Sequence, residues 1–224
     1  MKEGYTHISF VIDRSGSMQS VKSDTIGGFN KFLAEQKEVD CECTFTYCQF
    51  DDEYEVVHDF VNVKDVPELT DATFQPRGWT AMYDAIGRQI VETGNKLGAL
   101  SEDQRPDKII FVVLTDGAEN RSREYNGSKV KEMITHQTEK YGWAFMFLGA
   151  NINAEAVGSS LGIDADFTST FATSAAGMES TFDLLAAKTA GMRRSAGPLY
   201  CMGKKTPIAA AYSYTAEDKA QMQA

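Results

Sequence analysis

The stretch from residue 8 to residue 18 constrains the fold most. An apolar run, Ile8 to Ile12, stops abruptly at Asp13, and Ser15 and Ser17 follow. The run predicts a buried strand, and the polar residues place three oxygen ligands where that strand ends. Hard divalent cations such as Mg²⁺ prefer oxygen ligands in octahedral geometry. The stretch therefore predicts a Mg²⁺ or Mn²⁺ site at the carboxyl end of a sheet.

Two later apolar runs predict further buried strands. They are Ile109 to Leu114, which is followed by Asp116, and Trp143 to Leu148. Segments with helical spacing of apolar residues lie around these strands. Strands that alternate with helices predict an α/β sandwich, with a mostly parallel, Rossmann-like sheet and helices on both faces. The predicted helices cover residues 18–38, 81–97, 128–140, 154–161 and 174–194.

A hairpin is predicted between the first and second of these helices. Residues 43–50 and 54–63 are both β-rich and lie too close together for a crossover, so they predict an antiparallel pair at the edge of the sheet. Residues 167–171 predict a short edge strand. Asp13 and Asp116 both fall at the carboxyl ends of strands, where open α/β sheets bind ligands.

The chain has 224 residues, of which 42% are hydrophobic, enough for one sizeable core. We predict one domain over residues 1–195. Apolar periodicity fades after it, where Gly197, Pro198, Gly203 and Pro207 interrupt the pattern. Residues 196–224 are therefore predicted to be a C-terminal tail that is extended or contains a short helix.

The composition argues against several classes of partner. A net charge of −10 repels nucleic acid and anionic lipid. No stretch approaches the roughly 20 apolar residues of a membrane helix, and the N-terminal residues do not resemble a signal peptide. The cysteines, Cys41, Cys43, Cys48 and Cys201, lack zinc-site spacing and are interpreted as small buried residues of a reducing cytosol. We expect a cytoplasmic protein.

Three segments together carry a more specific signal. The first supplies Asp13, Ser15 and Ser17, the second supplies Thr80 in Gly-Trp-Thr-Ala-Met, and the third supplies Asp116 in Leu-Thr-Asp-Gly. This set resembles the von Willebrand factor type A (vWA) domain and its metal-ion-dependent adhesion site (MIDAS), over roughly residues 5–172. Any one of these residues alone would be interpreted as a helix cap, but all five together favour the metal site.

The resemblance implies a role for each of the five residues. The hydroxyls of Ser15 and Ser17 would ligate Mg²⁺ (or Mn²⁺) directly, and that of Thr80 would do so in one of two states. Asp13 and Asp116 would act through bound water or by alternating between direct and indirect contact. Because the direct ligands are mostly neutral, the ion keeps positive charge and attracts an Asp or Glu side chain of a partner protein.

Three residues near this site are candidate partner contacts. Arg14 and Arg77 could meet an acidic partner, and Trp79 could anchor the interface or simply pack within its loop.

Three functions remain open on the sequence alone. The main hypothesis is a non-enzymatic, metal-dependent protein-binding module. A second is an adaptor subunit of a separately encoded ATPase or assembly complex, since the chain resembles stand-alone prokaryotic or phage members of the family. A third is a Mg²⁺-dependent phosphoryl-transfer or hydrolytic enzyme. Against this third hypothesis, Ser15 stands where haloacid dehalogenases need a second Asp, and no P-loop, nucleophile elbow or companion His or Lys base is present.

Overall fold

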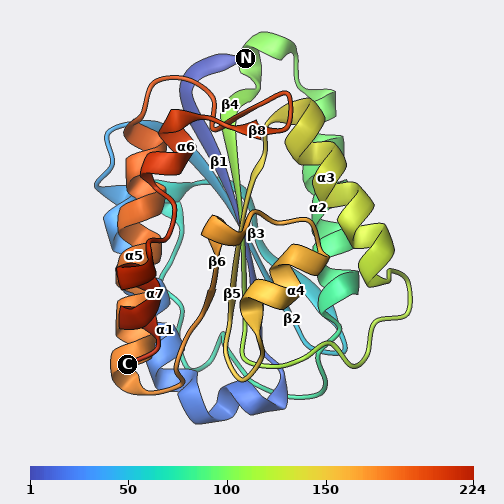
Figure 1. Ribbon diagram of the computed structural model, residues 1–224, viewed down its shortest axis with the longest axis vertical. Coiled ribbons are helices and arrows are strands. Elements are labelled where there is room, and N and C mark those ends of the chain that lie inside the picture. The colour runs from blue at the N-terminus through green and yellow to red at the C-terminus, as the bar shows by residue number, and fades with distance from the viewer.

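Six strands form the central sheet of the computed structural model, which describes residues 1–224 (Figure 1). The strand order is β3-β2-β1-β4-β5-β6, and all neighbours are parallel except β2 and β3. The predicted mostly parallel sheet with one antiparallel edge strand is confirmed. The strands are β1 (Lys2–Asp13), β2 (Glu42–Phe50), β3 (Tyr54–Asn62), β4 (Pro106–Thr115), β5 (Ala144–Gly149) and β6 (Thr168–Thr170).

Helices cover both faces of the sheet. Figure 1 shows α1 and α5 on one side, and α2, α3 and the short α4 on the other. None of the helices is both long and apolar enough to cross a membrane. The helices are α1 (Lys22–Lys37), α2 (Met82–Ala99), α3 (Gly127–Tyr141), α4 (Ala154–Ser160) and α5 (Ala175–Arg194), with 3-10 turns at Gly16–Val21, Val63–Asp65, Glu102–Gln104 and Ala165–Phe167.

The helix predicted over residues 18–38 is two elements. A 3-10 helix, Gly16–Val21, precedes α1. Met18 and Val21 are buried in this 3-10 turn, and their spacing of three suits the buried face of either helix type. The apolar pattern therefore predicted a helix here without distinguishing the two types.

The packing of α1 against α5 requires a glycine. A Cβ on Gly28 would lie 2.0 Å from Cδ2 of Phe182, far too close for two carbon atoms that are not bonded to each other. On the other side of α1, Phe29 and Phe32 pack edge-on against Phe10 of β1, with ring centroids 5.3 Å apart in both pairs. These contacts seat α1 between the sheet and α5.

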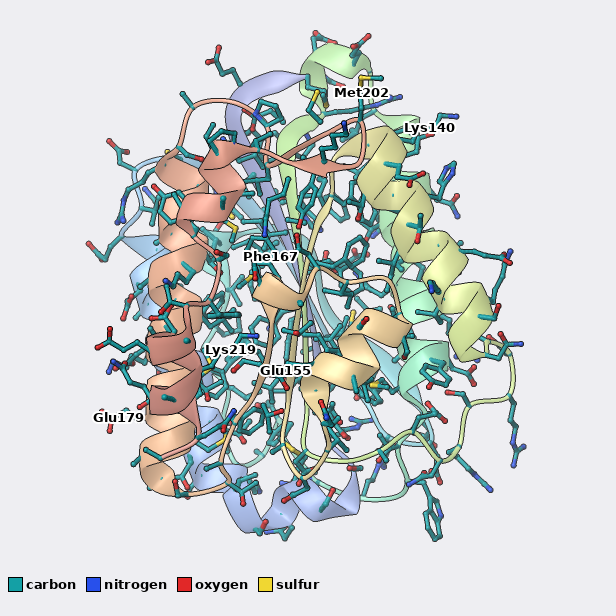
Figure 2. The ribbon with its side chains drawn as sticks, in the orientation of Figure 1. Lys140, Glu155, Phe167, Glu179, Met202 and Lys219 are labelled. Carbon is teal, nitrogen blue, oxygen red and sulfur yellow. The ribbon has the colours of Figure 1, made fainter.

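Residues 196–224 fold back onto the body of the protein. Met222 and Tyr214 are buried, and the carbonyl of Met222 accepts a hydrogen bond of 2.8 Å from the amide of Ala172. Lys219 faces Glu155 of α4 at 3.7 Å (Figure 2). The segment comprises β7 (Tyr200–Cys201), β8 (Lys204–Lys205), α6 (Pro207–Ala211) and α7 (Ala216–Met222).

His7 gives the fold a dependence on pH. It is fully buried in β1, its ring stacks on Phe60 with 3.8 Å between centroids, and its Nδ1 bonds Thr44 Oγ1 at 3.0 Å. Burial, and then the charge of Lys96, lower the pKa of His7 from 6.5 to about 3. At pH values between these two pKa values, His7 is protonated in the unfolded chain but neutral in the native protein. The free energy of unfolding therefore decreases as pH falls below about 6.5.

We expect the free energy of unfolding to decrease less steeply with falling pH in His7→Phe than in the wild type. Between pH 6.5 and 4.5 the His7 contribution removes about 2.5 kcal/mol of stability from the wild type. Urea denaturation at several pH values measures the difference between the two proteins, and every other titrating group cancels in that difference. If the free energies of unfolding of the two proteins change with pH in parallel, His7 is protonated in the native state as it is in the unfolded chain.

Candidate metal centre

Asp13 ends β1 and organises the first loop of the site. Its side chain is fully buried. Its Oδ1 accepts a hydrogen bond of 2.6 Å from the amide of Ser15, and its Oδ2 accepts one of 2.6 Å from Oγ1 of Thr115, the last residue of β4. The carboxylate therefore joins the ends of two neighbouring strands.

The two serines and the second aspartate continue from this point. Oγ of Ser15 lies 3.1 Å from Oγ of Ser17, and Ser17 Oγ donates a hydrogen bond of 2.5 Å to Oδ1 of Asp116. Ser15 and Asp116 are buried, whereas Ser17 is exposed. The cluster therefore opens to solvent at Ser17.

Thr80 reaches the same place from the second loop. A Cβ built on Gly117 would lie 3.6 Å from Thr80 Oγ1 and 3.7 Å from Ser17 Oγ, so both hydroxyls border the space that this glycine leaves free. Asn120 holds the backbone of Thr80 in position. Its Oδ1 accepts from the Thr80 amide at 2.9 Å, and its own amide donates to the Thr80 carbonyl at 3.0 Å.

The electrostatics of this cluster suit a cation. Neither Asp13 nor Asp116 pairs with a Lys, Arg or His side chain. Burial raises the pKa of Asp13 to about 7, and it also raises the pKa of Asp116. Two buried carboxyl groups without a cationic partner destabilise the empty arrangement, and a bound cation would relieve this cost.

The donor chemistry narrows the kind of metal. No group of three or more His, Cys, Asp and Glu side chains suited to a metal occurs in the protein, so a metal here must rely on hydroxyls as well as carboxylates. Such an all-oxygen donor set fits a hard cation such as Mg²⁺ or Mn²⁺. The residues present therefore fit the predicted metal.

The candidate partner contacts differ in what they can reach. Arg14 is buried, with its Nε 3.0 Å from Oδ2 of Asp51 and its Nη1 2.5 Å from Oε2 of Glu55. Arg77 donates from its Nε to the same Asp51 oxygen at 2.7 Å. Both guanidinium groups are thus engaged within the protein, whereas Trp79 is 59% exposed.

Asp51 is a residue of the site that the sequence analysis did not single out. It is buried, it binds both Arg14 and Arg77, and its carbonyl accepts from the amide of Ala81 at 3.1 Å. The first and second loops are further joined by a hydrogen bond of 2.8 Å from the Arg77 amide to the Arg14 carbonyl. Asp51 follows the carboxyl end of β2, so its position next to a parallel strand end was a signal that it lay at this edge.

The whole chain was also compared with known proteins. No family model matches it, and no curated protein sequence does. The three solved structures described here match with 13–15% identity. A von Willebrand factor type A protein from Catenulispora acidiphila is 15% identical, with a TM-score of 0.54, over 84% of this chain and 43% of that one.

Two further structures contain metal. Proximal thread matrix protein 1 from the mussel byssus, with a zinc-occupied MIDAS motif, is 15% identical, with a TM-score of 0.55, over 84% of this chain and 46% of that one. The manganese-loaded TRAP protein of Plasmodium vivax is 13% identical, with a TM-score of 0.51, over 75% of this chain and 68% of that one.

These likenesses establish the fold. The chain has a von Willebrand factor type A fold, as its motifs predicted. The chain spans less than half the length of the bacterial and mussel proteins.

Proposed function

We propose that the protein is a metal-dependent protein-binding module. In this proposal Asp13, Ser15, Ser17, Thr80 and Asp116 hold Mg²⁺ or Mn²⁺. One observation carries it: two buried carboxyl groups without a cationic partner and three hydroxyls meet at the carboxyl edge of the sheet. The zinc- and manganese-containing structures of the same fold support a divalent cation.

The bound ion would supply a positive charge that a carboxylate of a partner can complete. Ser15 and Ser17 would hold it with neutral oxygens, while Asp13 keeps the first loop in place through the Ser15 amide and Thr115. Because Ser17 is exposed, this side of the cluster is the approach for the Asp or Glu side chain of a partner protein.

The rim of the site suits an acidic partner. Trp79, one residue from Thr80, offers a large exposed aromatic surface. Arg121 and Arg123 follow the third loop, are exposed, and make no side-chain hydrogen bond or ion pair, unlike Arg14 and Arg77. Trp79, Arg121 and Arg123 are therefore the proposed partner contacts, and Arg14 and Arg77 are assigned to positioning the loops.

A binding role fits the chemistry of the cluster better than catalysis. Neither serine hydroxyl bonds a His or Lys side chain that could act as a base. A separately encoded ATPase or assembly complex of the cytoplasm is the kind of partner that we propose.

Paramagnetic Mn²⁺ tests the metal site directly, because the protein has two tryptophans. Trp79 adjoins Thr80, whereas Trp143 lies just before β5, about 20 Å from the carboxyl edge at roughly 3.3 Å per residue. We expect Mn²⁺ to broaden the indole N–H signal of Trp79 in NMR spectra far more than that of Trp143.

Serine variants complete this experiment. Ser17→Ala should abolish the selective broadening, and Ser23→Ala, an exposed serine at the start of α1, should leave it unchanged. If Mn²⁺ broadens both tryptophans alike, or neither, the proposed site is wrong. Partner capture from lysate in Mg²⁺ against EDTA, with Thr80→Ala as the comparison, then tests the binding role.

A further inference from the structure

The second loop, which carries Thr80, has no regular structure of its own. No helix or strand includes residues 77–81. Of the five backbone amides in this stretch, four donate hydrogen bonds to groups outside it. The position of the Thr80 hydroxyl therefore depends on the groups that hold the loop. The acceptors are the carbonyls of Arg14 and Asp51 and the side chains of Asp52 and Asn120.

Asp51 joins the second loop to the first. Its buried side chain accepts hydrogen bonds at Oδ2 from Nε of Arg14, at 3.0 Å, and from Nε of Arg77, at 2.7 Å. Its Oδ1 accepts from the amide of Glu53 at 2.6 Å, and its carbonyl accepts from the amide of Ala81 at 3.1 Å. One residue thus fixes both ends of the second loop, Arg77 through its side chain and Ala81 through its backbone.

The two loops also touch directly. The amide of Arg77 donates to the carbonyl of Arg14 at 2.8 Å, and the amide of Gly16 donates to the carbonyl of Gly78 at 3.3 Å. Gly78 adopts a φ of +67°, in the left-handed region that favours glycine. Because Gly78 lies two residues before Thr80, a loop released at Arg77 would lose the conformation that presents the Thr80 hydroxyl.

The charge of Arg77 opposes the binding of a cation nearby, because like charges repel each other. Its side chain is 55% exposed, and its Nη2 donates to Oε2 of Glu53 at 2.6 Å. A charge effect and a positioning effect of Arg77 therefore predict opposite results. Removal of the charge would strengthen metal binding, whereas release of the loop would weaken it.

We infer that Arg77 and Asp51 are positioning residues of the metal centre, which hold Thr80 in place for the ion without being ligands themselves. This inference rests on the proposed metal-binding function. Groups that orient the ligands of a metal commonly raise its affinity by about 10- to 100-fold. Because these bonds order the second loop, binding of the ion does not have to pay the entropy cost of ordering it.

Isothermal titration of the full chain with Mn²⁺ tests this inference in Arg77→Gln. We expect the variant to bind Mn²⁺ about tenfold or more weakly than the wild type. In EDTA it should melt close to the wild type, because Arg77 is half-exposed and Asp51 keeps its bond to Arg14. A variant that binds Mn²⁺ as tightly as the wild type, or more tightly, overturns the inference.

Arg88→Gln is the matched control. Arg88 of α2 also pairs with a glutamate, and its side-chain hydrogen bond and ion pair both go to Glu124 rather than to the second loop. Both variants lose the same charge, so Arg88→Gln should bind Mn²⁺ no more weakly than the wild type. Equal weakening in the two variants would contradict a specific role for Arg77.

A double-mutant cycle tests whether Arg77 acts through Thr80. In a Thr80→Ala background, Arg77→Gln should change the remaining Mn²⁺ affinity by no more than about twofold. The same loss of affinity in both backgrounds would overturn the inference while leaving the metal centre intact. A wild-type protein that binds no Mn²⁺ would overturn the proposed metal centre itself, so the two failures are distinguishable.

Discussion

Asp13→Asn is expected to abolish the metal-induced rise in melting temperature while leaving the metal-free protein at least as stable as wild type. In the wild type, metal at about 100 times its dissociation constant should add roughly 2.7 kcal/mol of stability. For a domain of this size that is a rise of about 5 to 10 °C. Without the Asp13 charge the ion should bind too weakly to produce it.

Local hydrogen bonding explains why the variant should fold. Asparagine Oδ1 can accept from the Ser15 amide as the aspartate does, and its Nδ2 can donate to Thr115 Oγ1. The Thr115 hydroxyl can then turn its hydrogen to the carbonyl of Gly117, which lies 3.2 Å away. The variant also removes a carboxylate that burial disfavours when no metal is bound.

Differential scanning calorimetry at pH 8, in EDTA and in millimolar Mg²⁺ or Mn²⁺, measures both parts of this prediction. Asp52→Asn is the control, because Asp52 is an exposed acid whose Oδ1 accepts only from the Trp79 amide on the rim. It should keep most of the metal-dependent rise. If Asp13→Asn shows the full metal-dependent rise in melting temperature, Asp13 does not help to hold the metal.

Arg193→Ala is expected to destabilise the protein by about 3 kcal/mol, because it leaves polar groups buried without partners. Arg193 is 1% exposed and lies in the last turn of α5. Its Nη1 donates to the carbonyl of Gln36 at 2.6 Å, and its Nη2 donates to the carbonyl of Cys41 at 3.1 Å. The guanidinium therefore holds the C-terminal end of α1 and the chain that follows it.

No carboxylate neutralises this buried cation, and burial lowers its pKa. The carbonyls at the C-terminal end of α1, where the helix dipole is negative, stabilise the positive charge instead of a carboxylate. Melting temperature should fall by roughly 6 to 12 °C in Arg193→Ala. Arg193→Met keeps the aliphatic stem of the side chain, so its melting temperature should lie between those of wild type and Arg193→Ala.

Arg194→Ala is the matched control. Arg194 is the next residue and is exposed, so its replacement should change stability by no more than about 0.5 kcal/mol. Equal effects at positions 193 and 194 would show that the bonds from Arg193 to α1 contribute nothing to stability.

The sequence alone predicted the architecture and brought the candidate ligands to one edge. Strand burial appears as apolar runs, and helices appear as apolar spacing. Asp13 is the last residue of its strand, and Asp116 directly follows its own. These are local signals, and parallel strands place their carboxyl ends together whatever the loops do. The segment boundaries consequently differ from the structure by only a few residues.

Only the tertiary structure decided what the charged and apolar surface residues do. Arg14, Arg121 and Arg193 look alike in the sequence, yet one is paired to Asp51, one is free and one is buried against α1. Asp51 likewise binds Arg14 of the first loop and Arg77 of the second, which lie far apart in the sequence. A side chain's partner across a sheet depends on long-range packing, which no local pattern encodes, so ligand types can be predicted from sequence while ion pairs and surfaces cannot.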